Sequence, residues 1–310
     1  MKGSSWQRSY EADLFFEVDC MKTIGIDLGG HKILGACVEK GKILKKDQVT
    51  TPGARDPETV VEAVVELVRS LDPSGRISGV GIGIPGMLGP ERQRVLKMPN
   101  FPAWENVKIK DLFVSRLNVD VRIENDANCY ALGEGLSGQA RGVSDYVVFT
   151  LGTGIGGGIV INGKLLTGAH GMAGELGHIA AGDFDRKCGC GAFGHIEPET
   201  GADGIEKKAA SLGLVPYIPS LWEERANYPQ KKIWDEALHS LARGIVSILH
   251  ILDPQLVILG GGISRSPELR EELEKFIDVY LSPAFKGKTE LKISDLGNDA
   301  AVIGAASLVR

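Results

Sequence analysis

Six side chains that can bind a metal ion or transfer a proton lie within one short stretch of this chain. They are Glu175, His178, Cys188, Cys190, His195 and Glu197. The two histidines and two cysteines follow one another at intervals of 10, 2 and 5 positions. Two sulfur and two imidazole ligands suit a tetrahedral Zn²⁺ ion. Because four protein ligands would leave no open coordination position, we expect such a zinc to be structural rather than catalytic.

The same residues could instead be two inert thiols and two surface histidines, since free cysteines often serve only in packing. Three glycines among the ligands favour the metal site, because they permit the tight turns that a metal knuckle needs: Gly189, Gly191 and Gly194. No second pair of ligands stands at zinc-finger spacing. If zinc holds this loop, the carboxylates of Glu175 and Glu197 remain available for a polar ligand.

A second polar group, Asn125-Asp126, follows a strand predicted at residues 119–124. Ligands of open α/β sheets bind at the carboxyl ends of the strands. Asp126 also precedes a helix predicted at 127–135, where Asn or Asp often serves only as a helix cap. Its position alone does not decide between a cap and a catalytic carboxylate.

The first half of the chain is repeated in the second. Leu28-Gly29 and Leu151-Gly152 lie 123 residues apart, and Gly41-Lys42 and Gly163-Lys164 lie 122 apart. This period predicts duplicated lobes, each opening with a glycine-rich hairpin. The backbone N–H groups of such hairpins can face an anion, so two facing hairpins favour a phosphate site. A third glycine run at 260–262 indicates either close approach to a ligand or a tight turn.

Apolar periodicity predicts the elements that position these groups. Helices are expected at 57–71, 107–117, 232–252, 267–281 and 299–309. Strands are expected at 23–27, 33–38, 77–84, 145–150, 256–259 and 291–294. The mixture predicts an α/β fold. We expect a poorly structured extension at 1–20, a first lobe at 21–137 against which the closing helix (299–310) can pack, and a second lobe with the zinc loop at 138–298.

Composition excludes several classes of protein. With 43% apolar and 24% charged residues, the 310-residue chain is typical of a globular protein. A net charge of −5 argues against a nucleic-acid partner, and no apolar run approaches the length needed to span a membrane. Residues 1–20 lack the apolar core of a signal peptide. Cys20, Cys37 and Cys129 are interpreted as free thiols, so we expect a cytoplasmic protein.

Taken together, the motifs resemble those of the ROK family of sugar kinases and repressors, within the actin-like ATPase superfamily. The motifs are IGIDLGGHK (24–32), NDAN (125–128), LGTGIGGG (151–158), GELGH (174–178), CGCGAFGHIE (188–197) and DPQLVILGGG (253–262). The resemblance covers residues 22–310. It implies two actin-like (ribonuclease H-like) lobes around a central cleft and an ATP-dependent hexokinase, most similar to a glucokinase that phosphorylates the O6 hydroxyl of glucose.

The resemblance also implies roles for individual residues. Asp126 is the expected general base, and Asn100, Asn125, Asp126, Glu175, His178 and Glu197 are the expected sugar ligands. His178 would present one ring nitrogen to zinc and the other to the sugar. Asp27 would help to hold Mg²⁺ with the nucleotide, whose other ligands would be Gly29, Gly30, Lys32, Thr153, Gly154, Gly261 and Gly262. The implied cofactors are therefore ATP, Mg²⁺ and structural Zn²⁺, and the implied assembly is a homodimer or homotetramer.

Three departures from the family pattern leave alternatives open. His31 replaces a usual threonine, His195 replaces a usual cysteine, and residues 198–203 replace a stretch of small residues near the sugar ligands. An N-acetylmannosamine or N-acetylglucosamine kinase, or a fructokinase, therefore remains an alternative, as does ADP or polyphosphate as the donor. A sugar-binding protein without turnover is disfavoured by Asp126. A sugar-responsive repressor is disfavoured because about 20 non-basic residues are too few for a DNA-binding helix-turn-helix.

Overall fold

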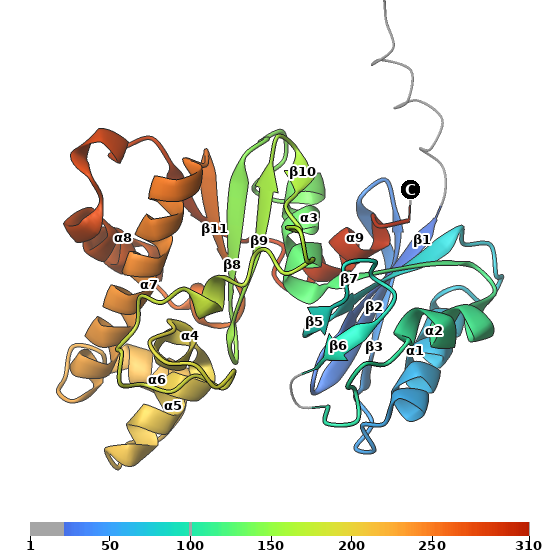
Figure 1. Cartoon of the computed structure of the whole chain (residues 1–310), viewed down its shortest axis with the longest axis horizontal. Coiled ribbons are helices and arrows are strands. Elements are labelled where there is room, and N and C mark those ends of the chain that lie inside the picture. The colour runs from blue at the N-terminus through green and yellow to red at the C-terminus, as the bar shows by residue number, and fades with distance from the viewer. Residues whose placement is uncertain (1–21, 99–100, 310) are drawn as a thin grey trace, which may run out of the picture.

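The computed structural model describes residues 22–98 and 101–309, which form two lobes built on separate five-stranded sheets (Figure 1). Both sheets are mixed, and helices cover them, so the predicted α/β fold with two lobes is confirmed. The predictions for residues 1–20 and for Asn100 lie outside the described residues. The lobe limits at 21–137 and 138–298 stay a proposal.

The first sheet has the strand order β3-β2-β1-β4-β7. Its strands are β1 (Thr23–Leu28), β2 (Lys32–Glu39), β3 (Lys42–Thr50), β4 (Gly79–Ile84) and β7 (Asp120–Asn125). The hairpin strands β1, β2 and β3 are antiparallel, whereas β1, β4 and β7 run parallel. Asp27 pairs with Gly83, and Ile84 pairs with Asn125, so the ends of the three parallel strands meet at one edge.

Two helices cover the outer face of this sheet, α1 (Pro57–Leu71) and α2 (Ile109–Leu117). Helix α1 begins where predicted, because Asp56 accepts a hydrogen bond of 2.9 Å from Thr59 N and proline follows at the first helical position. Its valine face is fully buried against the sheet. A short hairpin, β5 (Met87–Leu88) and β6 (Val95–Lys97), was not predicted from the sequence because its strands are too short to show alternation.

The second sheet repeats the first, with the order β10-β9-β8-β11-β12. Its strands are β8 (Tyr146–Leu151), β9 (Ile155–Ile161), β10 (Lys164–Leu165), β11 (Leu256–Gly260) and β12 (Glu290–Ile293). Here too an antiparallel hairpin leads into three parallel strands. The duplication predicted from the glycine spacing is therefore confirmed in strand order and direction.

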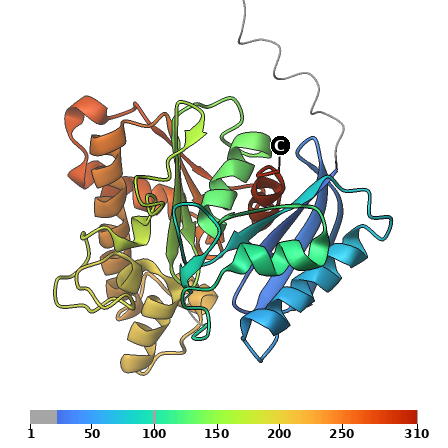
Figure 2. The same cartoon turned by 45° about the vertical axis from the view of Figure 1, so that its right-hand side comes forward.

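Helices α3 (Asp126–Ser137) and α9 (Asp299–Ala306) lie between the two sheets in both views (Figures 1 and 2). They approach closely, because a Cβ atom at Gly133 would lie 1.9 Å from the carbonyl oxygen of Ala300. Helix α9 also packs on the first sheet, where a Cβ at Gly25 would lie 1.8 Å from the carbonyl oxygen of Val302. The end of the chain thus returns to the first lobe, as the sequence analysis allowed.

Helices of the second lobe surround the long helix α7 (Gln230–Leu252). The others are α4 (Glu197–Thr200), α5 (Ala202–Ser211), α6 (Ile218–Glu223) and α8 (Leu269–Tyr280). The sequence analysis identified α7 and α8 and made no prediction for α5 and α6, whose apolar faces are short. Three 3-10 turns complete the lobe: Leu176–His178, Ile263–Arg265 and Pro283–Phe285. No helix among residues 22–98 and 101–309 is long and apolar enough to cross a membrane.

Candidate functional site

A pocket lies where the first sheet meets the second lobe. The first lobe contributes the residues after β4 and the start of α3: Gly86, Met87, Leu88, Asn125, Asp126, Ala127 and Asn128. The second lobe contributes strand β9 and a glycine-rich loop: Gly156, Gly157, Gly171, Met172, Ala173, Gly174 and Glu175. Three predicted sugar ligands therefore line one pocket, namely Asn125, Asp126 and Glu175. Their roles stay a prediction.

Asp126 is the first residue of α3, and Asn125 is its cap. The Asn125 side-chain oxygen accepts hydrogen bonds from Ala127 N at 3.0 Å and Asn128 N at 3.1 Å. The Asp126 carboxylate accepts one bond of 2.8 Å from Ala127 N. Asn125 therefore caps the helix, and Asp126 lines the pocket with a carboxylate that has this one hydrogen bond among the described residues; its role as the base stays a prediction.

Asp27, near the end of β1, lies close to Asp126 at the edge where the three parallel strands of the first sheet end. Burial, and after it the nearby Asp126 carboxylate, raise the pKa of the Asp27 carboxyl to about 7 against the opposing effect of Lys32. Burial also raises the pKa of Asp126, against the hydrogen bond from Ala127. Two half-buried carboxylates near one another attract a cation. This arrangement fits the Mg²⁺ role that the sequence predicts for Asp27, which stays a prediction.

The raised pKa of Asp27 predicts a pH-dependent stability difference between wild type and Asp27→Asn. Between pH 4 and about 7 the folded wild type binds more protons than the unfolded chain, so its free energy of unfolding falls as pH rises. The neutral variant lacks this term. The free energy of unfolding of Asp27→Asn, relative to that of the wild type, should therefore increase from pH 4 to pH 7 and stay constant above pH 7. Urea unfolding without magnesium or nucleotide measures it, with exposed Asp47→Asn as control; a pH-independent difference would contradict the prediction.

Glu175 faces the pocket from the second lobe. Burial raises the pKa of its carboxyl, His178 lowers it, and the carboxylates of Asp126 and Glu197 raise it again. One Glu175 oxygen lies 3.6 Å from Nδ1 of His178. A carboxylate against one histidine nitrogen orients the ring and leaves the other nitrogen for a metal. His178 is not among the pocket-lining residues, so its predicted contact with the sugar would require a ligand that reaches past Glu175.

Glu197 is the first residue of α4 and contacts the second glycine hairpin. Its Oε2 accepts a hydrogen bond of 3.1 Å from Ile155 N, and its Oε1 lies 3.8 Å from the Cys188 sulfur. A Cβ at Gly154 would lie within 2.4 Å of this carboxylate, so only glycine fits there without displacing it. Glu197 therefore joins the hairpin to the His/Cys loop, and it does not line the pocket of Asp126.

The predicted phosphate ligands lie on the turns of the two duplicated hairpins. Gly29 N donates to Lys32 O at 3.0 Å, and Gly152 N donates to Gly154 O at 3.0 Å, so each turn is closed by its own backbone hydrogen bond and the second turn is one residue shorter. Gly30 has open space around it, and Thr153 and Lys32 are exposed. A lysine and the backbone amides left free at two corresponding hairpin turns can bind a chain of phosphates.

Gly261 and Gly262 follow β11, beside the end of β8. Gly261 has a φ of +87°, and a Cβ there would lie 2.4 Å from the carbonyl oxygen of Leu151. Gly261 is therefore required by close backbone packing. Gly262 has no atom within 4 Å of a Cβ position, so space for a ligand remains on its side. The predicted contact with a nucleotide fits Gly262 better than Gly261.

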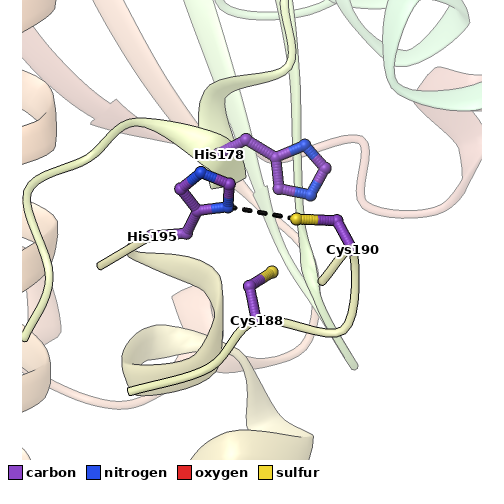
Figure 3. Close-up of side chains that lie close together, drawn as sticks. All are labelled: His178, Cys188, Cys190 and His195. Atoms are coloured by element: carbon purple, nitrogen blue, oxygen red, sulfur yellow. Dashed lines mark hydrogen bonds between the residues drawn. The ribbon is translucent and has the colours of Figure 1, made fainter. Parts of the chain in front are cut away.

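Four side chains converge in the loop between the 3-10 turn at Leu176–His178 and α4 (Figure 3). The ligand atoms of His178, Cys188, Cys190 and His195 all lie within 4.8 Å of one another. A zinc tetrahedron with ordinary Zn–N and Zn–S bonds has edges of about 3.3–3.8 Å, so a small contraction would complete it. Cys190 Sγ already lies 3.3 Å from His195 Nδ1. These residues fit Zn²⁺, as a two-His, two-Cys set.

The electrostatics of the cluster agree with this assignment. Burial and the neighbouring His178 lower the pKa of His195, which favours the neutral imidazole that a metal needs. Burial raises the pKa of the Cys188 thiol to about 11, so the protein alone does not stabilise the thiolate. A bound cation would supply that stabilisation. Gly191 and Gly194 have φ values of +102° and +74°, as expected for the turns of a metal knuckle.

Several pocket residues were missed by the sequence analysis. Gly86 to Leu88 follow β4, and Gly171 to Ala173 precede Glu175. The Pro85-Gly86 turn at the end of a predicted strand was the available signal for the first group. The second group is a loop without periodicity, and only its contact with the first lobe brings it to the pocket.

Comparison with known proteins extends over nearly the whole chain. A model of the ROK family matches residues 23–310. A glucokinase of Thermotoga maritima is 37% identical and aligns with 94% of this chain and 98% of its own. An N-acetyl-D-glucosamine kinase of Escherichia fergusonii is 36% identical over 84% of this chain and 90% of its own. The crystal structure of a ROK family glucokinase from Streptomyces griseus in complex with glucose and AMPPNP is 30% identical, with a TM-score of 0.80 over 93% of this chain and 98% of that one.

Proposed function

Because the chain belongs to the ROK family and is a sugar kinase, we propose that it transfers the γ-phosphate of ATP to a hexose hydroxyl, with glucose O6 as its preferred acceptor. The observation that carries the proposal is the pocket in which the Asp126 carboxylate, from the first lobe, meets Glu175, from the second. The 37% identical glucokinase and the glucokinase structure with glucose support the choice of sugar.

In this mechanism Asp126 is the general base. A sugar hydroxyl is a weak nucleophile, and a carboxylate within hydrogen-bond reach accelerates its attack by about 10²–10⁴-fold. The raised pKa of Asp126 makes it a stronger base than a solvent-exposed aspartate. Asn125 and Glu175 offer hydrogen bonds to sugar hydroxyls. Glu197 lies outside the pocket lining, so its predicted contact with the sugar rests on the sequence resemblance. The predicted role of Asn100 as a sugar ligand rests on the sequence alone.

The remaining residues bind the donor. The turns that contain Gly29, Gly30, Thr153 and Gly154 and the ammonium of Lys32 hold phosphate oxygens in this proposal, with Gly261 and Gly262 behind the nucleotide. The amide of Gly29 itself donates to Lys32 O, so Gly29 would act by letting the phosphates approach the turn. Mg²⁺, held near Asp27, would neutralise charge on the transferring phosphoryl group. Zn²⁺ would pin the loop that presents Glu175. AMPPNP in the related crystal structure supports ATP over ADP or polyphosphate as the donor.

A coupled ADP-release assay over a panel of hexoses tests the choice of substrate. We expect kcat/KM for glucose to exceed the values for mannose, fructose, N-acetylmannosamine and N-acetylglucosamine by about tenfold or more, because a polar site rejects sugars that leave its groups unpaired. ATPase activity without sugar is the control. One relative is an N-acetyl-D-glucosamine kinase, so a preference for an N-acetylated sugar is the alternative result. It would replace glucose in the proposal. A homodimer or homotetramer stays a prediction.

A further inference from the structure

Arg92 extends from the β5–β6 hairpin of the first lobe to the loop of the second lobe that carries Glu175. Its Nε lies 2.8 Å from Oε2 of Glu124, and its Nη1 donates a 3.0 Å hydrogen bond to the carbonyl oxygen of Gly171. The Arg92 side chain is only 15% exposed and the Glu124 side chain 7%. One side chain therefore connects both halves of the candidate sugar pocket.

Several features of Arg92 are unfavourable for folding. Its φ is +54°, a left-handed conformation that costs free energy for any residue except glycine. Its Nη2 is buried and has no acceptor among the described residues. A buried ion pair is itself weak evidence for stability, because removing both charges from water is costly. Stability therefore does not explain an arginine in this turn, and a function would.

Glu124, the carboxylate that Arg92 binds, contacts the residues on either side of the predicted base. Glu124 Oε1 accepts hydrogen bonds from Asn125 N at 2.9 Å and from Asn128 Nδ2 at 3.0 Å. These two residues flank Asp126 in the first turn of α3. Since Arg92 binds the other carboxylate oxygen, it fixes Glu124 and through it the orientation of this turn.

The Gly171 end leads to Glu175. Residues 166–175 form no helix or strand, so the backbone hydrogen bonds of a regular element do not fix this loop. A Cβ at Gly171 would lie 2.4 Å from Arg92 Nη1, which shows how closely the guanidinium is seated on the loop. The other described links between the lobes near here involve α3, such as Tyr146 to the carbonyl oxygen of Ala131 at 3.0 Å.

We propose that Arg92 is a positioning residue that latches the two lobes together around the sugar, by holding Glu124 beside Asp126 and the Gly171 carbonyl beside Glu175. The inference rests on the proposed function and assigns Arg92 to the sugar half of the site. The hydrogen bonds of the Arg92 side chain go to Glu124 and Gly171 and to neither glycine hairpin, so we expect the latch to affect sugar binding more than the binding of the nucleotide phosphates.

Substitution of Arg92 by glycine tests the latch, because glycine relaxes the left-handed turn while removing the side chain. The double variant Arg92→Gly/Glu124→Gln avoids an unpaired buried carboxylate if the single variant folds poorly. Arg94→Met is the matched control: Arg94 lies in the same hairpin and bonds within its own lobe, to Asn106 Oδ1 at 2.7 Å. Arg92→Lys keeps the charge but reaches one acceptor at a time, so it should rescue in part.

We expect the KM for the sugar to rise about tenfold or more in the glycine variants, the factor that one charge-assisted hydrogen bond supplies, while the KM for ATP stays within twofold of Arg94→Met. A sugar KM within twofold of the control, or an equal rise in both KM values, would overturn the inference.

Hydrogen exchange separates this inference from the proposed function, because it needs no turnover. In the unliganded protein, the amides of residues 168–176 should exchange about tenfold faster in Arg92→Gly/Glu124→Gln than in Arg94→Met. Unchanged exchange would reject the latch even in an active kinase. A wild type that phosphorylates no hexose, yet shows the exchange difference, would reject the proposed function and leave the latch supported.

Discussion

Replacing Asp126 by asparagine should lower kcat for sugar phosphorylation by about 10²–10⁴-fold. Asparagine has the same shape, and its side-chain oxygen can still accept the hydrogen bond from Ala127 N that Asp126 accepts at 2.8 Å. It cannot take a proton from a hydroxyl. The KM for the sugar should therefore change little while kcat falls, which is the signature of a group that acts in the transition state.

Stability provides an independent check on the same variant. Burial raises the pKa of Asp126, so the ionised carboxylate costs folding free energy at neutral pH, and the neutral amide should not destabilise the unliganded protein. Asp111→Asn, in the first turn of α2 and outside the pocket, is the matched control for losing an acid near a helix start. Turnover within tenfold of wild type in a folded Asp126→Asn protein would remove Asp126 from the mechanism.

Removal of zinc should loosen the sugar half of the site and lower the melting temperature by several degrees. The loop between His178 and Glu197 contains no long helix or strand, and one isolated bridge between Lys187 and Phe193 joins its two sides. Structural zinc supplies about 10–16 kcal/mol of binding free energy in small zinc domains. Part of the binding free energy would add to the free energy of unfolding of this protein. Glu175 and Glu197 flank the loop, so the sugar KM should rise with the loss of metal.

Metal analysis after purification without a chelator should find about one zinc per chain, and none in Cys188→Ser/Cys190→Ser. His170→Ala is a matched control, because His170 is exposed in the same segment and lies outside the cluster. Zinc added back after chelation should restore the melting temperature of the wild type and leave the double variant unchanged. Wild-type protein without zinc would refute the four-ligand site.

Local patterns in the sequence determined much of this protein. The matched spacings of Leu28-Gly29 with Leu151-Gly152 predicted two lobes of the same topology, and the two sheets repeat each other strand by strand. The valine periodicity of 57–71 predicted α1 to the residue. The intervals from His178 to His195 predicted a ligand cluster that the fold assembles. Such features are readable because helix periodicity, hairpin turns and a short metal loop depend on residues close together in the chain.

Contacts between distant residues were decided only by the tertiary structure. The sequence could not show that Asn125 is the cap of α3 or that Asp126 and Glu175 line one pocket, because the pocket is formed by two lobes. Nor could it pair Arg92 with Gly171, 79 positions away, or place Glu197 against the hairpin at Ile155. The contact of Arg92 depends on how the two lobes meet, and that of Glu197 on how α4 packs against β9. Neither packing leaves a period in the sequence. The pKa of Asp27 has the same origin, since burial and a neighbour 99 positions along the chain raise it.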